Sequence, residues 1–235
     1  MTWNLLGSRG VLVEPVAAAI LERRPDAVAI QEIQRRQARR LARRLGWHHK
    51  WALKHFPRSH LIWWRAEGLA ILSPHALRGA IHLRISDERS RLSYRRRVLT
   101  GATVRREDAE LRLFNTHLGG STAERLPQVR RIAARLRSAA PAGTSSVADV
   151  LAGDFNAAGD PATLDPLTAL GLRDPGGGHS SPADDPYQRI DYVLVPQAAT
   201  SVSSDTPAGG AEWARLSDHL PVVVAFTVSN VQVAP

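Results

Sequence analysis

Polar side chains recur along this chain at the ends of short apolar segments. A compact apolar run of this kind indicates a β-strand, and a rigid sheet holds the residue at the strand end in a fixed position. Strand ends can therefore gather residues that lie far apart in the sequence into one site. Five side chains able to bind a metal or a phosphate lie next to such runs: Glu32, His117, Asp154, Asn156 and Asp218. The pattern predicts a sheet-based fold with one polar site.

The apolar spacing changes between strand-like and helix-like segments along the whole sequence. Strands are expected at residues 2–6, 26–30, 68–73, 96–105, 110–117, 147–152, 189–195 and 220–228. Helices are expected at residues 11–24, 34–45, 122–138 and 162–170, and loops at 141–146, 174–188 and 200–210. No internal repeat or linker divides the chain, so residues 1–235 are expected to form a single α/β domain.

Cysteine is absent from the 235 residues, which excludes disulfides, thiolate metal sites and cysteine nucleophiles. Any metal must be bound by oxygen or imidazole, and carboxylates with an amide favour Mg²⁺, with Mn²⁺ or Ca²⁺ as alternatives. The sequence has no run of about 18 apolar residues, so no transmembrane helix is expected. Its first residues lack the features of a signal peptide, and the sequence leaves the cellular compartment open.

The formal net charge of +9 allows two interpretations. Basic side chains attract nucleic acid and acidic lipid surfaces. However, nearly all of the positive charge comes from arginines spread along the chain. Such a pattern also arises from coding bias, without a basic binding surface. Arginine clusters at residues 35–44 and 95–97 are candidates for contact with a polyanion, although the first is also explained as the solvated face of a helix.

Two short motifs carry the residue types that hydrolysis of a phosphate ester needs, namely a base for water and anchors for a cation. Asp154 and Asn156 lie two residues apart, so on a strand their side chains would point to one side. In Ser217-Asp218-His219, the imidazole can act as base and the carboxylate can anchor a metal. Each motif alone also fits an ordinary turn.

Three further polar residues lie in apolar segments. Asp191 interrupts an apolar strand and needs a partner, either an imidazole that it would orient or the neighbouring Arg189. Glu32 follows a buried strand and needs solvent or a cation. Asn4 lies on a buried strand, where it either serves a site or is a satisfied core amide.

Taken in order, seven segments resemble those of the endonuclease/exonuclease/phosphatase superfamily, which includes deoxyribonuclease I, exonuclease III, neutral sphingomyelinases and inositol-polyphosphate 5-phosphatases. Each segment is short, but they run in one order from the first residues almost to the last. The segments are Thr2-Trp3-Asn4-Leu5, Ile30-Gln31-Glu32, Glu67-Gly68-Leu69-Ala70-Ile71-Leu72-Ser73, Asn115-Thr116-His117-Leu118, Gly153-Asp154-Phe155-Asn156, Arg189-Ile190-Asp191-Tyr192 and Ser217-Asp218-His219-Leu220-Pro221.

The resemblance implies a four-layer α/β/β/α sandwich, in which two packed mixed sheets are flanked by helices and the site lies at one end. It implies that Glu32 and Asp218 bind Mg²⁺, and that Asp154, with Asn4 and Asn156, positions the metal, the phosphate or the attacking water.

The resemblance also implies roles for the histidines. His219, paired with Asp191, acts on the water or contacts the phosphate. His117 contacts the phosphate or assists the leaving group, and Glu67 matches a glutamate that orients this second histidine.

The resulting hypothesis is a divalent-metal-dependent phosphodiester hydrolase, in the first place a nuclease acting on DNA, working as a monomer without an obligate protein partner. A phospholipid phosphodiesterase or an inositol-phosphate phosphatase is the alternative, and an inactive binding module is a remote one. Trp63 and Trp64 bear on this choice, because they are either core aromatics of a strand, which the sequence favours, or a loop that touches a membrane.

Overall fold

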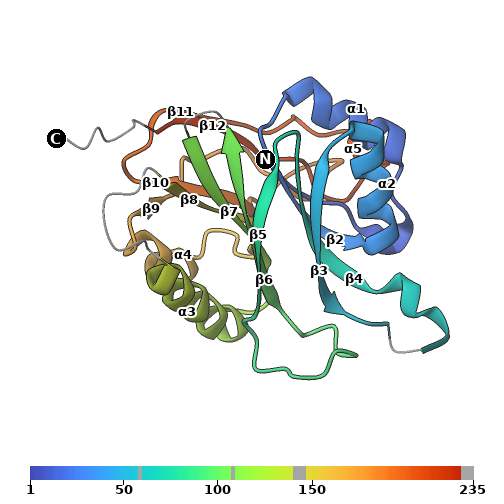
Figure 1. Cartoon of the computed structure of the whole chain (residues 1–235), viewed down its shortest axis with the longest axis horizontal. Helices are drawn as coiled ribbons and strands as arrows, with labels where there is room; N and C mark the ends of the chain where they lie inside the picture. The colour runs from blue at the N-terminus through green and yellow to red at the C-terminus, as the bar shows by residue number, and fades with distance from the viewer. Residues whose placement is uncertain (58–59, 107–108, 140–146, 229–235) are drawn as a thin grey trace.

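The computed structural model describes residues 1–57, 60–106, 109–139 and 147–228, and these residues form four layers. Figure 1 shows helices α1 (Val13–Arg23) and α2 (Arg35–Leu45) against one sheet, and helices α3 (Thr122–Ala139) and α4 (Pro161–Thr168) against the other. The two sheets face each other in the middle. The predicted α/β/β/α sandwich is therefore confirmed.

The first sheet has four strands in the order β1-β2-β4-β3, and the second has six in the order β5-β6-β7-β8-β10-β9. The first consists of β1 (Thr2–Asn4), β2 (Val28–Gln34), β4 (Glu67–Ser73) and β3 (His48–His55). The second consists of β5 (Leu77–Arg84), β6 (Val98–Arg106), β7 (Ala109–His117), β8 (Val147–Asp154), β10 (Asp191–Pro196) and β9 (Leu172–Arg173). The remaining elements are β11 (Thr200–Asp205), which pairs with β12 (Val223–Thr227), the short helix α5 (Ala211–Ala214), and the 3-10 helices η1 (Gly7–Arg9) and η2 (His60–Arg65).

Each boundary between layers is filled by its own apolar cluster, as burial of apolar surface requires. Ile20 and Leu41 represent the cluster under α1 and α2, and Phe114 and Ile132 the one under α3. Small and β-branched side chains such as Val150 fill the space between the sheets. Among the described helices, none is long and apolar enough to cross a membrane.

Helix α2 shows how local sequence sets the position of these layers. The side chains of Gln34 and Gln37 close a reciprocal capping box at its start, which satisfies backbone donors that the first turn leaves free. Gly46 ends the helix with φ of 69°, a left-handed conformation that glycine adopts without strain. Leu41 and Ala42 face the core, so the arginines of this helix are directed outward.

A buried polar contact fixes the two sheets relative to each other. The side chain of Gln31 on β2 donates a hydrogen bond to Asn115 on β7, with 2.7 Å between Nε2 and Oδ1. Asn115 Nδ2 in turn donates to the carbonyl oxygens of Ile30, at 2.9 Å, and Ala70, at 2.8 Å. Gln31 and Asn115 belong to the recognised motifs, but their role here is to join the sheets.

Several expectations about the chain need correction. Residues 200–210 were expected to be a loop, but Thr200–Asp205 form strand β11 because they pair with β12. Strand β5 was not expected, although its half-buried Leu77, Ile81 and Leu83 pack against the core. Trp63 and Trp64 were expected in the core of a strand, yet they lie on η2 and are 61% and 42% exposed. The loop predicted at 141–146 lies outside the described residues.

Replacing Asn115 with alanine is expected to destabilise the protein by about 3 kcal/mol, because a buried donor on Gln31 and two carbonyl oxygens lose their partner. Urea denaturation followed by circular dichroism measures the change. Gln197→Ala, at an exposed position, is the control and should change stability by less than about 0.5 kcal/mol. Equal stability of the two variants would contradict the structural role of Asn115.

Candidate active site

The predicted polar residues meet at one end of the sandwich, where strands of both sheets end or begin. Asp154 closes β8, and the strand register places it beside His117 of β7 on one side and Asp191 of β10 on the other. Asn4 closes β1 of the facing sheet, and its Nδ2 donates a hydrogen bond to Asp154 Oδ2 over 3.0 Å. The site therefore exists only where the two sheets come together.

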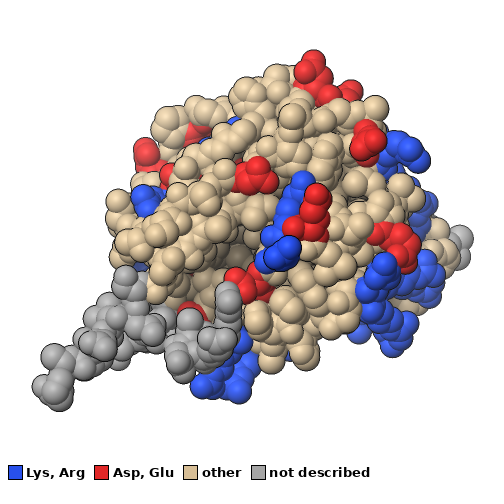
Figure 2. All heavy atoms as spheres, turned by 90° about the horizontal axis from the view of Figure 1, so that it is seen from above, with Lys and Arg blue, Asp and Glu red and all other residues tan. Residues whose placement is uncertain are grey.

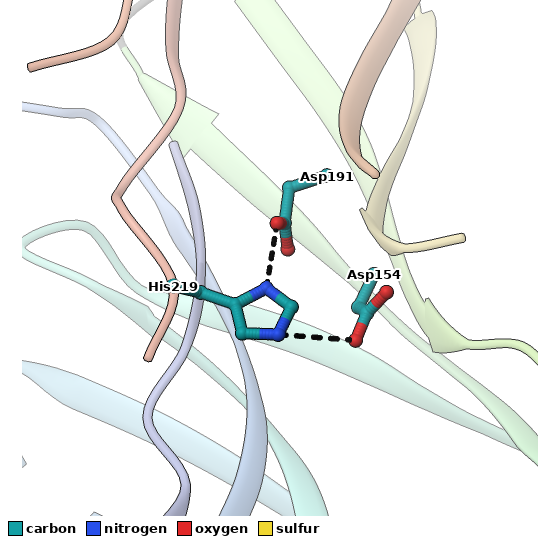
Figure 3. A group of neighbouring side chains, drawn as sticks. All are labelled: Asp154, Asp191 and His219. Carbon is teal, nitrogen blue, oxygen red and sulfur yellow. Dashed lines mark hydrogen bonds and ion pairs between the residues drawn. The ribbon is translucent and has the colours of Figure 1, made fainter. Parts of the chain in front are cut away.

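His219 lies between two carboxylates at the centre of this end (Figure 3). Its Nδ1 is 2.7 Å from Asp191 Oδ2, and its Nε2 is 4.0 Å from Asp154 Oδ2. All three residues are buried. Burial alone would lower the pKa of His219, but the charges of Asp191, Asp154 and Asp218 raise it to about 10. Offsetting the charges of Asp154 and Asp218 would lower this pKa toward its ordinary range, where the imidazole can accept a proton.

Backbone contacts fix the position of this triad. Trp3 Nε1 donates to the carbonyl oxygen of His219 over 2.8 Å, and the amide of His219 donates to Ser217 Oγ over 3.2 Å. The buried hydroxyl of Ser180 accepts hydrogen bonds from the amides of Ile190, at 3.3 Å, and Asp191, at 3.2 Å. The predicted loop at residues 174–188 thus supports Asp191 through Ser180.

His117 lies between Glu32 and Asp154. Its Nδ1 is 3.6 Å from Glu32 Oε1, and its Nε2 is 3.6 Å from Asp154 Oδ2. Burial, followed by the positive charges of Lys54 and Arg97, holds the pKa of His117 well below its usual value. The ring is therefore neutral at physiological pH and can both donate and accept a hydrogen bond.

Glu67 was expected to orient His117, but its charged partners are different. Glu67 Oε2 is 3.5 Å from Lys54 Nζ and 3.7 Å from His55 Nε2. The carboxylate that faces Nδ1 of His117 is that of Glu32, which reaches the site because β2 bulges there and Glu32 adopts a φ of 52°. The sequence motif did not reveal this bulge.

Asn156 lies just beyond the end of β8, so the alternation of side chains along a strand does not apply to it. Its φ is 50°, a left-handed conformation that asparagine tolerates. Its amide N–H donates to Asp154 Oδ1 over 2.9 Å, and its Nδ2 donates to the carbonyl oxygen of Leu118 over 3.1 Å. Asn156 thus orients Asp154 through its backbone.

The carboxylates at this end fit a hard divalent cation. Burial and then the nearby charge of Asp191 raise the pKa of Asp154, while burial raises the pKa of Glu32 against the opposing charge of Lys54. Asp191 Oδ1 is buried without a hydrogen-bond partner among the described residues. Oxygen donors with raised proton affinity and too little positive charge around them suit Mg²⁺ or a similar ion.

The geometry groups the metal-competent atoms differently from the sequence. Glu32, Asp218 and Asp154 were the expected ligands. Among the described residues, the cluster whose ligand atoms all lie within 4.8 Å of one another consists of Asp154, Asp191 and His219. Asp154 is common to both sets. Because Asp191 is already paired with His219, it is a weaker candidate for holding the ion directly.

Two cations beside the site, the buried Lys54 and the partly buried Arg97, were not predicted as site residues, although Arg97 belongs to the arginine cluster at 95–97. Lys54 is 4% exposed, and its pKa is lowered by burial and by Arg97. Arg97 donates to the carbonyl oxygens of Leu118, at 3.0 Å, and Tyr94, at 2.6 Å. The positive charges of Lys54 and Arg97 interact electrostatically with both His117 and Glu32. One signal was present: Lys54 lies on the same phase of its strand as the buried Ala52.

Arg125 of α3 braces the loop that follows Asp154. Its guanidinium donates to the carbonyl oxygen of Asn156 over 2.7 Å and to Asp160 Oδ2 over 2.7 Å. Thr163 Oγ1 donates to the same carboxylate oxygen over 2.8 Å. These contacts tie α3 and the start of α4 to the site.

Comparison with known proteins shows which family the chain belongs to. The model of the endonuclease/exonuclease/phosphatase family matches residues 1–219. The chain belongs to this family. Its members hydrolyse phosphate esters, typically with a divalent metal, so the protein is a phosphoester hydrolase of the endonuclease/exonuclease/phosphatase family, and the predicted resemblance is confirmed.

Solved structures of the family share the fold over nearly the whole chain. A family member from Bacteroides vulgatus has a TM-score of 0.78 and 18% identity and covers 97% of both chains. A mannosyl-6-phosphatase from Bacteroides thetaiotaomicron has a TM-score of 0.71 and 16% identity, covering 96% of this chain and 98% of that one. Truncated TDP2 from Caenorhabditis elegans has a TM-score of 0.72 and 16% identity, covering 97% and 96%. A search of curated protein sequences gives no match.

The ion pair that braces the site loop should make stability depend on pH in a defined window. Hydrogen bonds from Arg125 and Thr163 lower the pKa of Asp160 from 3.8 to about 2, so its stabilising effect is full above pH 3.8 and lost as pH falls through about 2. Asp160→Asn should therefore be less stable than wild type in urea at pH 7 and at pH 5, with a gap that narrows between pH 4 and pH 2. A gap that stays constant with pH would contradict this pairing.

Proposed function

We propose that this family member is a metal-dependent phosphodiester hydrolase that acts as a nuclease on DNA. The observation that carries the hydrolytic part is His219, buried with Asp191 at Nδ1 and with Asp154 facing Nε2. A carboxylate that fixes one imidazole nitrogen leaves the other free to handle a proton, which is what activation of water requires.

In the proposed reaction, His219 Nε2 takes a proton from water as the water oxygen attacks phosphorus in line with the leaving oxygen. Asp191 holds the imidazole and stabilises its protonated form. His219 can accept this proton once the charges of Asp154 and Asp218, which together with that of Asp191 raise its pKa, are offset. A new P–O bond forms as the ester P–O bond breaks, so no covalent enzyme intermediate is needed.

The remaining residues are proposed to hold the phosphate and the ion. Glu32, Asp218 and Asp154 would hold Mg²⁺, which when bound offsets the negative charge that develops on the phosphoryl oxygens. The side chains of Asn4 and Asn156 are proposed to position the phosphoryl oxygens. The neutral ring of His117 can donate a hydrogen bond to the leaving oxygen.

The preference for DNA is supported by the distribution of basic charge. The outer face of α2 exposes arginines, and the net charge of the chain is +9. Figure 2 shows basic side chains gathered along one side of the upper face, where α1 and α2 lie in Figure 1. Phosphate contacts by such side chains provide much of the affinity for nucleic acid.

A second candidate is a phospholipid phosphodiesterase on the same scaffold. The exposure of Trp63 and Trp64 supports it, because exposed tryptophans are frequent at membrane interfaces. At 16% identity, the mannosyl-6-phosphatase shows only that the two proteins share a fold. This similarity does not favour a phosphate monoester as the substrate.

Supercoiled plasmid DNA should be nicked in the presence of Mg²⁺ or Mn²⁺ and left intact in EDTA. His219→Ala should lower the nicking rate by about 10²–10⁴-fold, the usual loss when a general base is removed. His75→Ala is the matched control, because His75 pairs with Asp26 and is not part of the site. Gel electrophoresis over time measures the rate.

Two results would contradict the proposal. Nicking that persists in EDTA would exclude metal dependence. Nicking that persists in His219→Ala would exclude His219 as the general base. Absence of nicking by wild type, with metal-dependent hydrolysis of phosphatidylcholine or sphingomyelin vesicles, would favour the phospholipid candidate.

A further inference from the structure

A hollow of about 360 Å³ lies beside α2 and is lined by aromatic side chains. Its walls include Trp51, Phe56, Trp63 and Trp64, together with Arg35 and Arg36. None of these residues belongs to the hydrolytic site described above. A hollow of this size can accept one flat ring system.

The tryptophans of this hollow are unusual because they leave large apolar surfaces in water. Trp63 is 61% exposed and Trp64 is 42% exposed, whereas aromatic side chains in folded proteins are mostly buried. Trp51 is held in place, because its Nε1 donates to the carbonyl oxygen of Ile33 over 2.9 Å. The hollow thus combines a fixed aromatic wall with two exposed rings.

Arg35 and Arg36 add positive charge beside the hollow. Both are exposed, and neither forms a hydrogen bond or ion pair with another residue in the described part of the chain. By contrast, Arg44 on the same helix pairs with Glu14. Free guanidinium groups next to an aromatic hollow are suited to an anionic ligand that also has a flat apolar part.

The hollow adjoins the catalytic end through the strands that build both. Ala66 lines the hollow, and the next residue, Glu67, pairs with Lys54 in the active site. In the first sheet, Gln34 is the register partner of Glu67, and Arg35 follows Gln34 directly. A chain that lies across this edge can reach both places.

We propose that this hollow binds an unpaired base of single-stranded DNA, while Arg35 and Arg36 contact the neighbouring phosphates. The proposal rests on the proposed nuclease function and gives it a preference for unpaired strands. Stacking on exposed tryptophans recognises any base through its flat face and contributes about 1–3 kcal/mol per base. In a duplex, the bases stack on each other and cannot enter a hollow.

The charge beside the hollow favours a nucleic acid over a lipid surface as its occupant. A membrane-binding surface needs a contiguous apolar patch that projects into the bilayer. Here the tryptophans line a concave space with two arginines at its wall. Binding to vesicles that depends on the tryptophans would therefore contradict the proposal.

Binding should be measured in EDTA, so that the result does not depend on hydrolysis. Fluorescence anisotropy of a labelled eight-nucleotide oligothymidylate is titrated with protein in about 0.15 M salt, which screens distant charges. Trp63→Ala and Trp64→Ala are each expected to weaken binding about tenfold, in line with loss of one stacking contact. Trp63→Phe should retain most of the affinity.

Controls separate this effect from general loss of structure or charge. Leu21→Ala removes another exposed apolar side chain, on α1 and outside the hollow, and should bind as wild type. The tryptophan substitutions should not change the affinity of the protein for a self-complementary DNA duplex. Circular dichroism melting checks that each variant is folded.

The outcomes for the hollow and for the nuclease are distinguishable. Unchanged oligothymidylate binding in both tryptophan variants would overturn the base-binding proposal, even if plasmid is nicked. Loss of binding to anionic phosphatidylglycerol vesicles, without an effect on oligothymidylate, would overturn it in favour of a membrane. Tryptophan-dependent binding of oligothymidylate, without metal-dependent cleavage of either plasmid or oligothymidylate, would uphold the hollow as a base site and reject the nuclease.

Discussion

The hydrogen bond from Asn4 to Asp154 crosses from one sheet to the other, and the site depends on this approach of the sheets. Asn4 ends a strand of the four-stranded sheet, whereas Asp154 ends a strand of the six-stranded sheet. Gln31 and Asn115 hold the same two sheets together deeper in the core. Because both contacts are buried and directional, a shift of one sheet against the other would cost stability and disperse the site.

This arrangement concentrates charge that the protein alone does not balance. Burial raises the pKa of Glu32 and of Asp154, and three carboxylates together raise the pKa of His219 to about 10. Lys54 and Arg97 supply part of the missing positive charge. A divalent cation held by these carboxylates would complete the balance and leave His219 able to accept a proton, so metal dependence is expected from the same burial that shapes the site.

The family resemblance implied the layers, and the apolar pattern brought Asp154, Asp191 and His219 forward as candidates, because each is a polar residue in or next to an apolar run. It did not reveal the contacts of Glu67, since the bulge at Glu32 and the pairing of Lys54 depend on neighbouring strands. It also misplaced Trp63 and Trp64, because apolar composition favours burial and does not show that a short 3-10 helix leaves them exposed.

Hydrolysis of bis-p-nitrophenyl phosphate tests the central claim most directly, because this small diester needs neither a basic surface nor a base-binding hollow. The account predicts release of p-nitrophenol with Mg²⁺ or Mn²⁺, no release in EDTA, and a loss of about 10²-fold or more in Asp191→Asn, where His219 loses its carboxylate partner. Release in EDTA, or full activity of Asp191→Asn, would contradict a metal-dependent site centred on His219.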